Sequence, residues 1–254
     1  MTTKSTRTVG VIPARLESAR LPNKPILDIC GFPMIAHVYL RSLLAEELDD
    51  LYVATDSNEI QAAIEAVGGK VIRTSSTHPN GTSRIAEAAS NIEADIIVNI
   101  QGDEALLRPT HIDKAIHGLI AQPHAVASIL VNQFQKRDSP SDIKVVLNQN
   151  NEIMYCSRSD IPYQRENRPI SMLKAYHIVP FRKSFLLEYT SLEPTTLEKI
   201  ESNEYIRILE HGYKIHAVEV DSAAISVDTP EDLAYVRKEM PKDPLFRHYK
   251  SKFI

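Results

Sequence analysis

Two hydrophobic patterns alternate along the first half of the chain. Short continuous apolar runs, typical of strands buried on both faces of a sheet, precede longer segments with apolar residues every three or four positions, the spacing of an amphipathic helix. The predicted strands are Val9–Ile12, Leu51–Ala54, Lys70–Arg73 and Asp95–Ile100. The predicted helices are Pro33–Glu46, Asn58–Val67, Thr82–Asn91 and Pro109–Ala121. Their alternation predicts an α/β fold around a parallel sheet.

After Ala125 the pattern changes to short apolar runs without helical segments between them, which indicates an antiparallel layer. The predicted strands there are Val126–Val131, Ile143–Leu147 and Glu152–Cys156, followed by a polar loop or lid over Asp160–Ser171. The remaining predicted elements are an extended Lys174–Phe181, helices Phe185–Tyr189, Leu197–Glu210 and Pro230–Met240, and a strand Ile215–Val220. We therefore expect one domain over residues 1–254, with a smaller antiparallel or lid subdomain at about 125–190 that carries dimer contacts and binds the second substrate.

Composition narrows the class of protein. Hydrophobic residues make up 43% and charged residues 24% of the 254 residues, as in ordinary soluble domains. The formal net charge of -4 disfavours a nucleic-acid-binding module, which needs clustered cations. No apolar stretch reaches membrane-spanning length, and the two cysteines, Cys30 and Cys156, lack metal-ligand spacing. These observations predict a cytoplasmic protein that binds neither nucleic acid nor membrane.

A basic loop follows the first predicted strand. It carries Arg15, Arg20 and Lys24 within ARLESARLPNKP, at the carboxyl end of a parallel strand, where open α/β sheets bind their ligands. Guanidinium groups bind phosphate oxygens bidentately, and a lysine adds a point charge. The chain has neither a GxxxxGK[ST] loop nor a GxGxxG turn. The loop therefore predicts a triphosphate site that differs from those of Walker ATPases and dinucleotide-binding dehydrogenases.

Acidic residues are expected at the same edge of the sheet. The fourth predicted strand ends in NIQGDE, which places Gln101 and Asp103 beside the basic loop, and Asp228 occurs later in VDTPEDL. Mg²⁺ binds one or two carboxylates together with phosphate oxygens and waters, so Asp103 and Asp228 are candidate ligands. For Asp228, a plain N-cap before the helix that begins at Thr229-Pro230 is an equally good interpretation.

A third loop, HPNGTSR, contains Asn80, Gly81, Thr82 and Arg84 at the start of a predicted helix. Its backbone groups can serve a base or a ribose, although an ordinary turn and cap has the same sequence pattern.

Seven segments in this order resemble the 3-deoxy-manno-octulosonate (KDO) cytidylyltransferases, which make CMP-KDO for bacterial surface glycans. They are VIPARLESARLPNKP, DICGFPMIAHVY, YVATDS, NGTSR, NIQGDE, YCSRSDIPY and VDTPEDL, and they span about residues 8 to 240. The resemblance implies a Rossmann-like, GT-A-like nucleotidyltransferase fold, with a mixed sheet, helices on both faces and a smaller antiparallel insertion. It also implies a homodimer, CTP and a small acidic sugar as substrates, and Mg²⁺ as cofactor.

The resemblance, taken together with the loops described above, gives a candidate role to each site residue. Arg15, Lys24 and Asp103 would be catalytic, and Asp103 and Asp228 would hold magnesium. The nucleotide would contact Arg15, Arg20, Lys24, Asn80, Gly81, Thr82, Arg84, Gln101 and Asp103. The acceptor would contact Arg158, His177, Glu204 and Tyr205. No protein nucleophile is implied, because the sugar's anomeric hydroxyl attacks the α-phosphorus while the enzyme supplies positioning and positive charge.

The sugar-binding positions depart from the family pattern. The family's RHLGIYAYR is KAYHIVPFR here, so Ala175 replaces a sugar-binding His and Val179 a Tyr; Tyr205 replaces a Gln. These changes are expected to weaken binding of KDO itself, because a site that loses hydroxyl partners discriminates against that substrate. His177, two residues past the lost His, either restores a contact or is a plain strand residue.

The sequence leaves several functions open. The leading hypothesis is CMP transfer to KDO or to an amino or deoxy variant of it. The alternatives are the same chemistry on another acidic acceptor, such as a nonulosonate or a phosphonate, and a non-catalytic relative that binds nucleotide.

Overall fold

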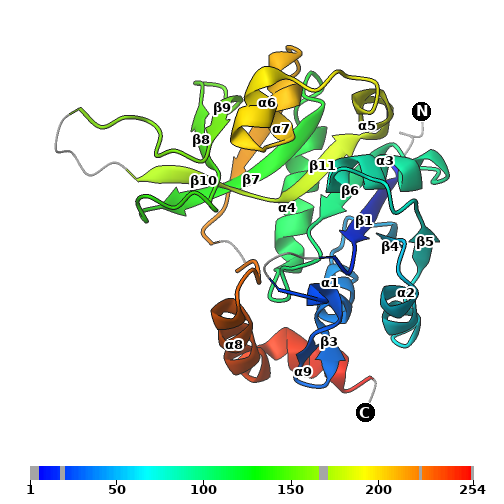
Figure 1. Cartoon of the computed structure of the whole chain (residues 1–254). Coiled ribbons are helices and arrows are strands. Elements are labelled where there is room, and N and C mark those ends of the chain that lie inside the picture. The colour runs from blue at the N-terminus through cyan, green and yellow to red at the C-terminus, as the bar shows by residue number, and fades with distance from the viewer. Residues whose placement is uncertain (1–5, 18–20, 166–170, 223–224, 253–254) are drawn as a thin grey trace.

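A computed structural model describes residues 6–17, 21–165, 171–222 and 225–252 (Figure 1). The strands are β1 Thr8–Ala14, β2 Asp28–Ile29, β3 Phe32–Pro33, β4 Asp50–Thr55, β5 Val71–Arg73, β6 Ile96–Ile100, β7 Ala127–Phe134, β8 Lys144–Leu147, β9 Ile153–Ser157, β10 Met172–Tyr176, β11 Ile178–Arg182 and β12 Ile215–Glu219. The α-helices are α1 Met34–Ser42, α2 Asn58–Glu65, α3 Gly81–Ser90, α4 Pro109–Ile120, α5 Lys183–Tyr189, α6 Thr196–Glu201, α7 Tyr205–Glu210, α8 Pro230–Glu239 and α9 Pro244–Lys250, with 3-10 turns η1 Lys24–Ile26 and η2 Met240–Lys242.

Among the described residues, one mixed sheet of ten strands forms the centre of the molecule. Its order is β5-β4-β1-β6-β11-β7-β10-β8-β9, with β12 paired to β7. The first four strands are parallel, as the alternating pattern predicts, and β11 joins β6 in the antiparallel sense. The antiparallel strands β7 to β10 continue this same sheet, while β2 and β3 form a separate hairpin.

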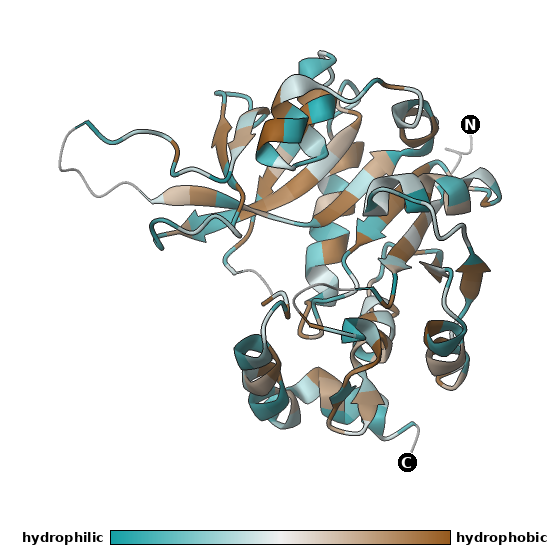
Figure 2. Ribbon diagram, viewed as in Figure 1, coloured by the Kyte–Doolittle hydropathy of each residue, from teal (hydrophilic) through white to brown (hydrophobic). Residues whose placement is uncertain are grey.

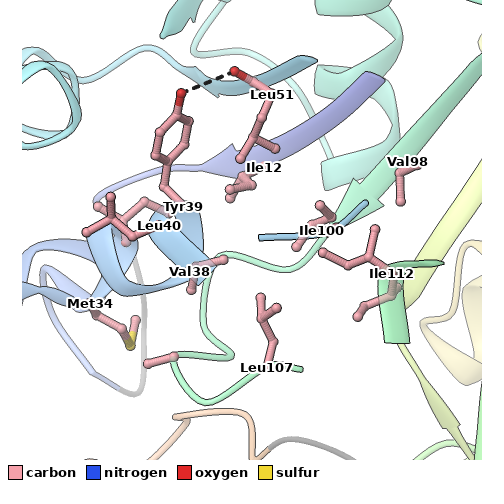
Figure 3. Close-up of a cluster of buried hydrophobic side chains, with 14 of the residues drawn as sticks. Ile12, Met34, Val38, Tyr39, Leu40, Leu51, Val98, Ile100, Leu107 and Ile112 are labelled. Atoms are coloured by element: carbon pink, nitrogen blue, oxygen red, sulfur yellow. Dashed lines mark hydrogen bonds between the residues drawn. The ribbon is translucent and has the colours of Figure 1, made fainter. Parts of the chain in front are cut away.

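Helices cover both faces of the sheet, as expected. Alternate residues of a strand point to opposite faces, so β1 contributes Val9 and Val11 to one core and Ile12 and Ala14 to the other. The core containing Ile12 packs against α1, α2 and α4 (Figure 3), and the other packs against α3, α5 and α7. Hydrophobic residues are frequent along the strands of the sheet, whereas hydrophobic and hydrophilic residues alternate along the helices (Figure 2).

Two predicted elements are each interrupted. The single helix predicted over Leu197–Glu210 is wrong, because Ser202 adopts a left-handed conformation with φ of 48° that ends α6 before α7 begins. The extended segment predicted over Lys174–Phe181 is confirmed, although it divides at His177 into the two strands β10 and β11. Both breaks face the same cavity, which is described below.

The carboxyl ends of β1 and β6 lie side by side because these strands are parallel neighbours in register, with Val11 opposite Asn99. This edge carries the loops in which ligand-binding residues are expected. Within the described part of the chain, no helix is both long and apolar enough to cross a bilayer.

Candidate functional site

At the carboxyl ends of β1 and β6, the backbone of the turn after β6 packs closely against the backbone of β1. A Cβ on Gly102 would lie 3.2 Å from the carbonyl oxygen of Pro13 and 3.0 Å from Cδ1 of Ile35. Such contacts are tighter than a side chain tolerates without displacing its neighbours, so glycine lets the turn after β6 approach β1. The QGD segment is thereby held against the loop that carries Arg15.

A cavity of about 420 Å³ opens at this edge. Three segments far apart in the sequence form it: the loop after β1, the start of α3 and the turn after β6. The predicted site residues that line it are Arg15, Lys24, Asn80, Gly81, Arg84, Gln101 and Asp103. The structure therefore brings together the cations, the Gly-containing loop and the aspartate that the sequence placed at one sheet edge.

Lys24, which lines this cavity, bridges two carboxylates. Its Nζ lies 2.7 Å from Oδ2 of Asp103 and 3.1 Å from Oδ1 of Asp228. Burial opposes the charge on Lys24, but the two carboxylates outweigh that effect and raise its pKa. Asn23 precedes it with φ of 54°, a left-handed conformation that asparagine tolerates better than most residues.

Asp228 does not cap the helix that follows it, so the N-cap interpretation is wrong. Thr229 is the N-cap of α8, where its side chain accepts a hydrogen bond from the backbone N–H of Asp232 and forms a capping box. The Asp228 carboxylate is therefore available to Lys24. The N–H of Val227 donates to the carbonyl of Asp103 at 3.0 Å, which holds the two aspartates side by side.

The donor set of Asp103 and Asp228 fits Mg²⁺. Their carboxylate oxygens already converge on one positive group, the Lys24 ammonium, and hard oxygen donors are what this ion prefers. The described residues contain no group of three or more His, Cys, Asp or Glu side chains arranged for a metal. Phosphate oxygens and waters would have to complete an octahedral shell around the two carboxylates.

A second cavity, of about 610 Å³, adjoins the first and shares Arg15, Asn80, Gly81, Gln101 and Asp103 with it. Its further lining includes Glu104 and Asp228. It also includes all four residues predicted to contact the acceptor, which are Arg158, His177, Glu204 and Tyr205. A molecule bound here would lie next to one bound in the first cavity, beside Asp103.

Arg158 connects two walls of the second cavity through hydrogen bonds. Its side chain donates to the carbonyls of Pro140 and Glu201, both at 2.7 Å, and of Ser202 at 3.1 Å. Three of its five donors are thus engaged by the protein. Arg158 fixes the distance between the loop at Pro140 and the α6–α7 break.

Glu204 connects the second cavity with the start of α3. Burial raises the pKa of its carboxyl, and the hydroxyl and amide of Thr82 beside it offset part of that effect. Thr82 itself is buried with 1% exposure, so it supports the Gly81 loop from behind and does not line either cavity.

Arg84 is buried, and its guanidinium already has partners within the protein. Its guanidinium pairs with Oδ1 of Asp56 and donates to Oγ1 of Thr74, both at 2.7 Å. It therefore fixes α3 against the segments after β4 and β5. Arg20 lies outside the described residues.

Sequence reasoning gave no role to Glu104. Its side chain is 2% exposed, and burial together with the neighbouring Asp103 charge raises its pKa well above the usual range. Its Oε1 accepts a 3.4 Å hydrogen bond from Ser226. Burial next to a charged aspartate cannot be read from the letters QGDE, because it depends on the packing of Ser226 and Tyr176 around the side chain.

The fold and site define a nucleotidyltransferase. The sequence profile described as cytidylyltransferase matches residues 9–215. The 3-deoxy-manno-octulosonate cytidylyltransferase of Syntrophus aciditrophicus is 41% identical over 236 residues, covering 90% of this chain and 95% of that protein. The Escherichia coli protein of the same name is 38% identical, covering 93% and 97%.

Solved structures agree with these relatives. CMP:2-keto-3-deoxy-manno-octonic acid synthetase complexed with CTP superposes with a TM-score of 0.90 at 38% identity, over 93% of this chain and 99% of that one. The chain therefore belongs to the 3-deoxy-manno-octulosonate cytidylyltransferase family, and it is an enzyme of the cytidylyltransferase class. A 4-diphosphocytidyl-2C-methyl-D-erythritol synthase from Anaerococcus prevotii shares the fold alone, with a TM-score of 0.62 at 13% identity over 93% of this chain and 96% of that one.

Proposed function

We propose that this cytidylyltransferase transfers CMP from CTP to a 3-deoxy-ulosonic acid, KDO or an amino or deoxy variant of it, and releases pyrophosphate. One observation carries the proposal: two adjoining cavities share Arg15, Gln101 and Asp103 at the ends of β1 and β6. The first takes the nucleotide and the second the acceptor. The relatives that bear the KDO cytidylyltransferase name support this acceptor class.

In the proposed reaction the acceptor's anomeric oxygen attacks the α-phosphorus of CTP. The new oxygen–phosphorus bond forms as the bond to the β-phosphate breaks, and the hydroxyl proton passes to solvent. Arg15 and Lys24 would hold the phosphates and stabilise the charge that develops on the leaving pyrophosphate. Asn80 and Gly81, at the start of α3, and Gln101 would position the nucleoside. Arg20 is assigned to the phosphates from the resemblance.

Asp103 and Asp228 would hold Mg²⁺. When bound, the ion supplies positive charge that neutralises the triphosphate. Lys24 now sits between both carboxylates, so we propose that its ammonium moves toward the phosphates as the nucleotide enters. This gives Lys24 a role in catalysis beyond its ion pairs with Asp103 and Asp228.

The acceptor side is proposed to be built by the second cavity. Arg158 shapes it, Glu204 and Tyr205 line it from the α6–α7 break, and His177 lines it from the sheet. We propose that residues of about 125–190 act as the acceptor-side subdomain and carry a homodimer contact. Large apolar side chains of that segment stand in solvent, with Met154 62% and Tyr163 88% exposed. Light scattering of the purified protein tests the dimer.

Pyrophosphate release tests the reaction. Purified protein with CTP and Mg²⁺ is offered KDO, 8-amino-KDO, a nonulosonate and a simple phosphonate, with acceptor-free and ATP-containing reactions as controls. Turnover restricted to CTP with a 3-deoxy-ulosonic acid supports the proposal, and the ranking of KDO against 8-amino-KDO decides the variant. Turnover with the nonulosonate or phosphonate alone would assign the same chemistry to another acceptor. Such a reaction belongs in the cytoplasm, where CTP is available.

A further inference from the structure

His177 belongs to a row of side chains on one face of the strand that runs through β10 and β11. Ala175, Val179 and Phe181 lie in the core beneath α7, whereas Tyr176 and Ile178 belong to the core on the other face. Among these four described residues on one face of the strand, His177 lines the second cavity, whereas Ala175, Val179 and Phe181 do not. Ala175 and Val179 are 1% and 0% exposed, so they do not reach a ligand.

Stacking fixes the orientation of the His177 ring. Its centroid lies 5.6 Å from that of Tyr205 with the rings 15° from parallel, and Tyr205 is also stacked with Phe181 at 6.5 Å and 18°. The Tyr205 hydroxyl accepts a 3.5 Å hydrogen bond from Nδ2 of Asn99. No group within the described residues hydrogen-bonds a ring nitrogen of His177. The imidazole is held rigidly by its face while both nitrogens remain available.

The strand register places His177 near Gln101 and Asp103, which line both cavities. In the β11–β6 pair, Ile178 is opposite Ile100, so His177 extends the register to Gln101, two residues before Asp103. A group that meets His177 therefore lies at the junction of the two cavities, close to the reacting end of the acceptor.

We propose that His177, clamped against Tyr205, is the acceptor-specificity residue of this enzyme and exchanges hydrogen bonds with a hydroxyl of the bound 3-deoxy-ulosonic acid near its reacting end. The inference rests on the proposed function and names the contact that selects the acceptor.

The charge state of the ring agrees with this role. Burial lowers the pKa of His177 to about 4, and the nearby charges of Lys174 and Arg158 act in the same direction. A neutral imidazole offers one donor and one acceptor, the pair that matches a hydroxyl. The acceptor's carboxylate is left to the cations of the same cavity, among them Arg15 and Lys199.

The test measures KM for each substrate with the full-length enzyme, using KDO and 8-amino-KDO as acceptors and pyrophosphate release as readout. His177→Ala is expected to raise the KM of the preferred acceptor about tenfold, the size of one buried hydrogen bond, with the KM for CTP changed less than about twofold. His177→Asn keeps a donor and an acceptor and should recover part of that loss. Tyr205→Leu, which removes the stacked ring, should raise the acceptor KM more than Tyr205→Phe does.

His124→Ala is the matched control, because His124 is exposed and pairs with Glu152, and neither residue lines either cavity. If the wild type turns over and His177→Ala has an unchanged KM for the acceptor, the inference about His177 is overturned while the proposed function stands. An equal rise of both KM values with a lowered Tm assigns His177 a structural role and overturns it as well. Absence of turnover by the wild type on either ulosonic acid overturns the proposed function and the inference with it.

Discussion

His37 and Tyr249 meet in the interior of the protein, with the Tyr249 hydroxyl 2.6 Å from Nδ1 of His37. The other ring nitrogen of His37 lies 2.7 Å from the carbonyl oxygen of Ile29. Because a carbonyl only accepts, Nε2 carries the proton and Nδ1 accepts from Tyr249. One neutral imidazole on α1 thus connects the C-terminal helix α9 with the β2–β3 hairpin, a few residues past Lys24.

Tyr249→Phe is expected to lower the free energy of unfolding by about 1 to 3 kcal/mol, because it leaves a buried acceptor on His37 without its donor. Urea unfolding at neutral pH measures the change. Tyr235→Phe is the control, since Tyr235 is 48% exposed. Equal stability of the two variants would show that the buried hydrogen bond contributes nothing.

Acid should destabilise the enzyme through His37. Burial is the main cause that lowers its pKa from the ordinary 6.5 to about 4. The unfolded chain therefore binds a proton that the folded protein does not, and stability falls as pH decreases from about 6.5 to about 4. One such group contributes at most roughly 3 kcal/mol over this window. Unfolding free energies measured between pH 7.5 and 4.5 should decline, and less steeply in His37→Gln; parallel profiles would contradict this assignment.

The sequence predicts the parallel half of the fold well because its strands are buried on both faces and its helices are amphipathic. Val9–Ile12 and Asp95–Ile100 match β1 and β6 closely, and the residues after them converge as expected. Ser57 caps α2, a role for which serine is among the preferred residues. These features depend on local pattern and on the rule that parallel strands present their carboxyl ends together.

Long-range contacts account for what the sequence did not predict. The break at Ser202 has no glycine or proline, and the helical periodicity continues across it. α9 was not predicted; it depends on Asp243, which caps it and pairs with the buried Arg41 at 3.1 Å. An arginine such as Arg158 is a typical anion-binding residue, yet its guanidinium donates hydrogen bonds to backbone carbonyls of two other segments. Such partners become visible only when the chain is folded.

Gly102→Ala should impair catalysis more than folding. The added Cβ would press on the carbonyl oxygen of Pro13 and on Ile35, so the turn that carries Asp103 has to move by a few tenths of an ångström. Small displacements of catalytic groups reduce rates strongly, and we expect kcat to fall about 10- to 100-fold. Gly81→Ala is a graded comparison, since its Cβ would meet Pro13 Cγ at an ordinary 3.5 Å. Loss of kcat of the same size in both variants would speak against the steric explanation.

Arg15→Ala tests the phosphate assignment. Arg15 lines both cavities, and one charge-assisted hydrogen bond is worth roughly 1.5 to 3 kcal/mol, so kcat/KM for CTP should fall about 10- to 100-fold. Arg15→Lys should recover part of the loss, because it restores the charge without the bidentate fork. Arg108→Ala is the control, since Arg108 is half exposed and pairs with Asp221. Unchanged CTP kinetics in Arg15→Ala would remove this residue from the nucleotide site.

Asp103→Asn and Asp228→Asn should each lower kcat by about two or more orders of magnitude, because an amide cannot replace a carboxylate in a Mg²⁺ site. The two residues also share Lys24, whose raised pKa reflects both charges. Removal of either carboxylate leaves one ion pair to Lys24, so the fold should persist by circular dichroism. Asp221→Asn serves as the control because Asp221 is 74% exposed outside both cavities. The Mg²⁺ concentration for half-maximal activity should rise in both site variants, and a variant with wild-type Mg²⁺ dependence would exclude its aspartate from the metal site.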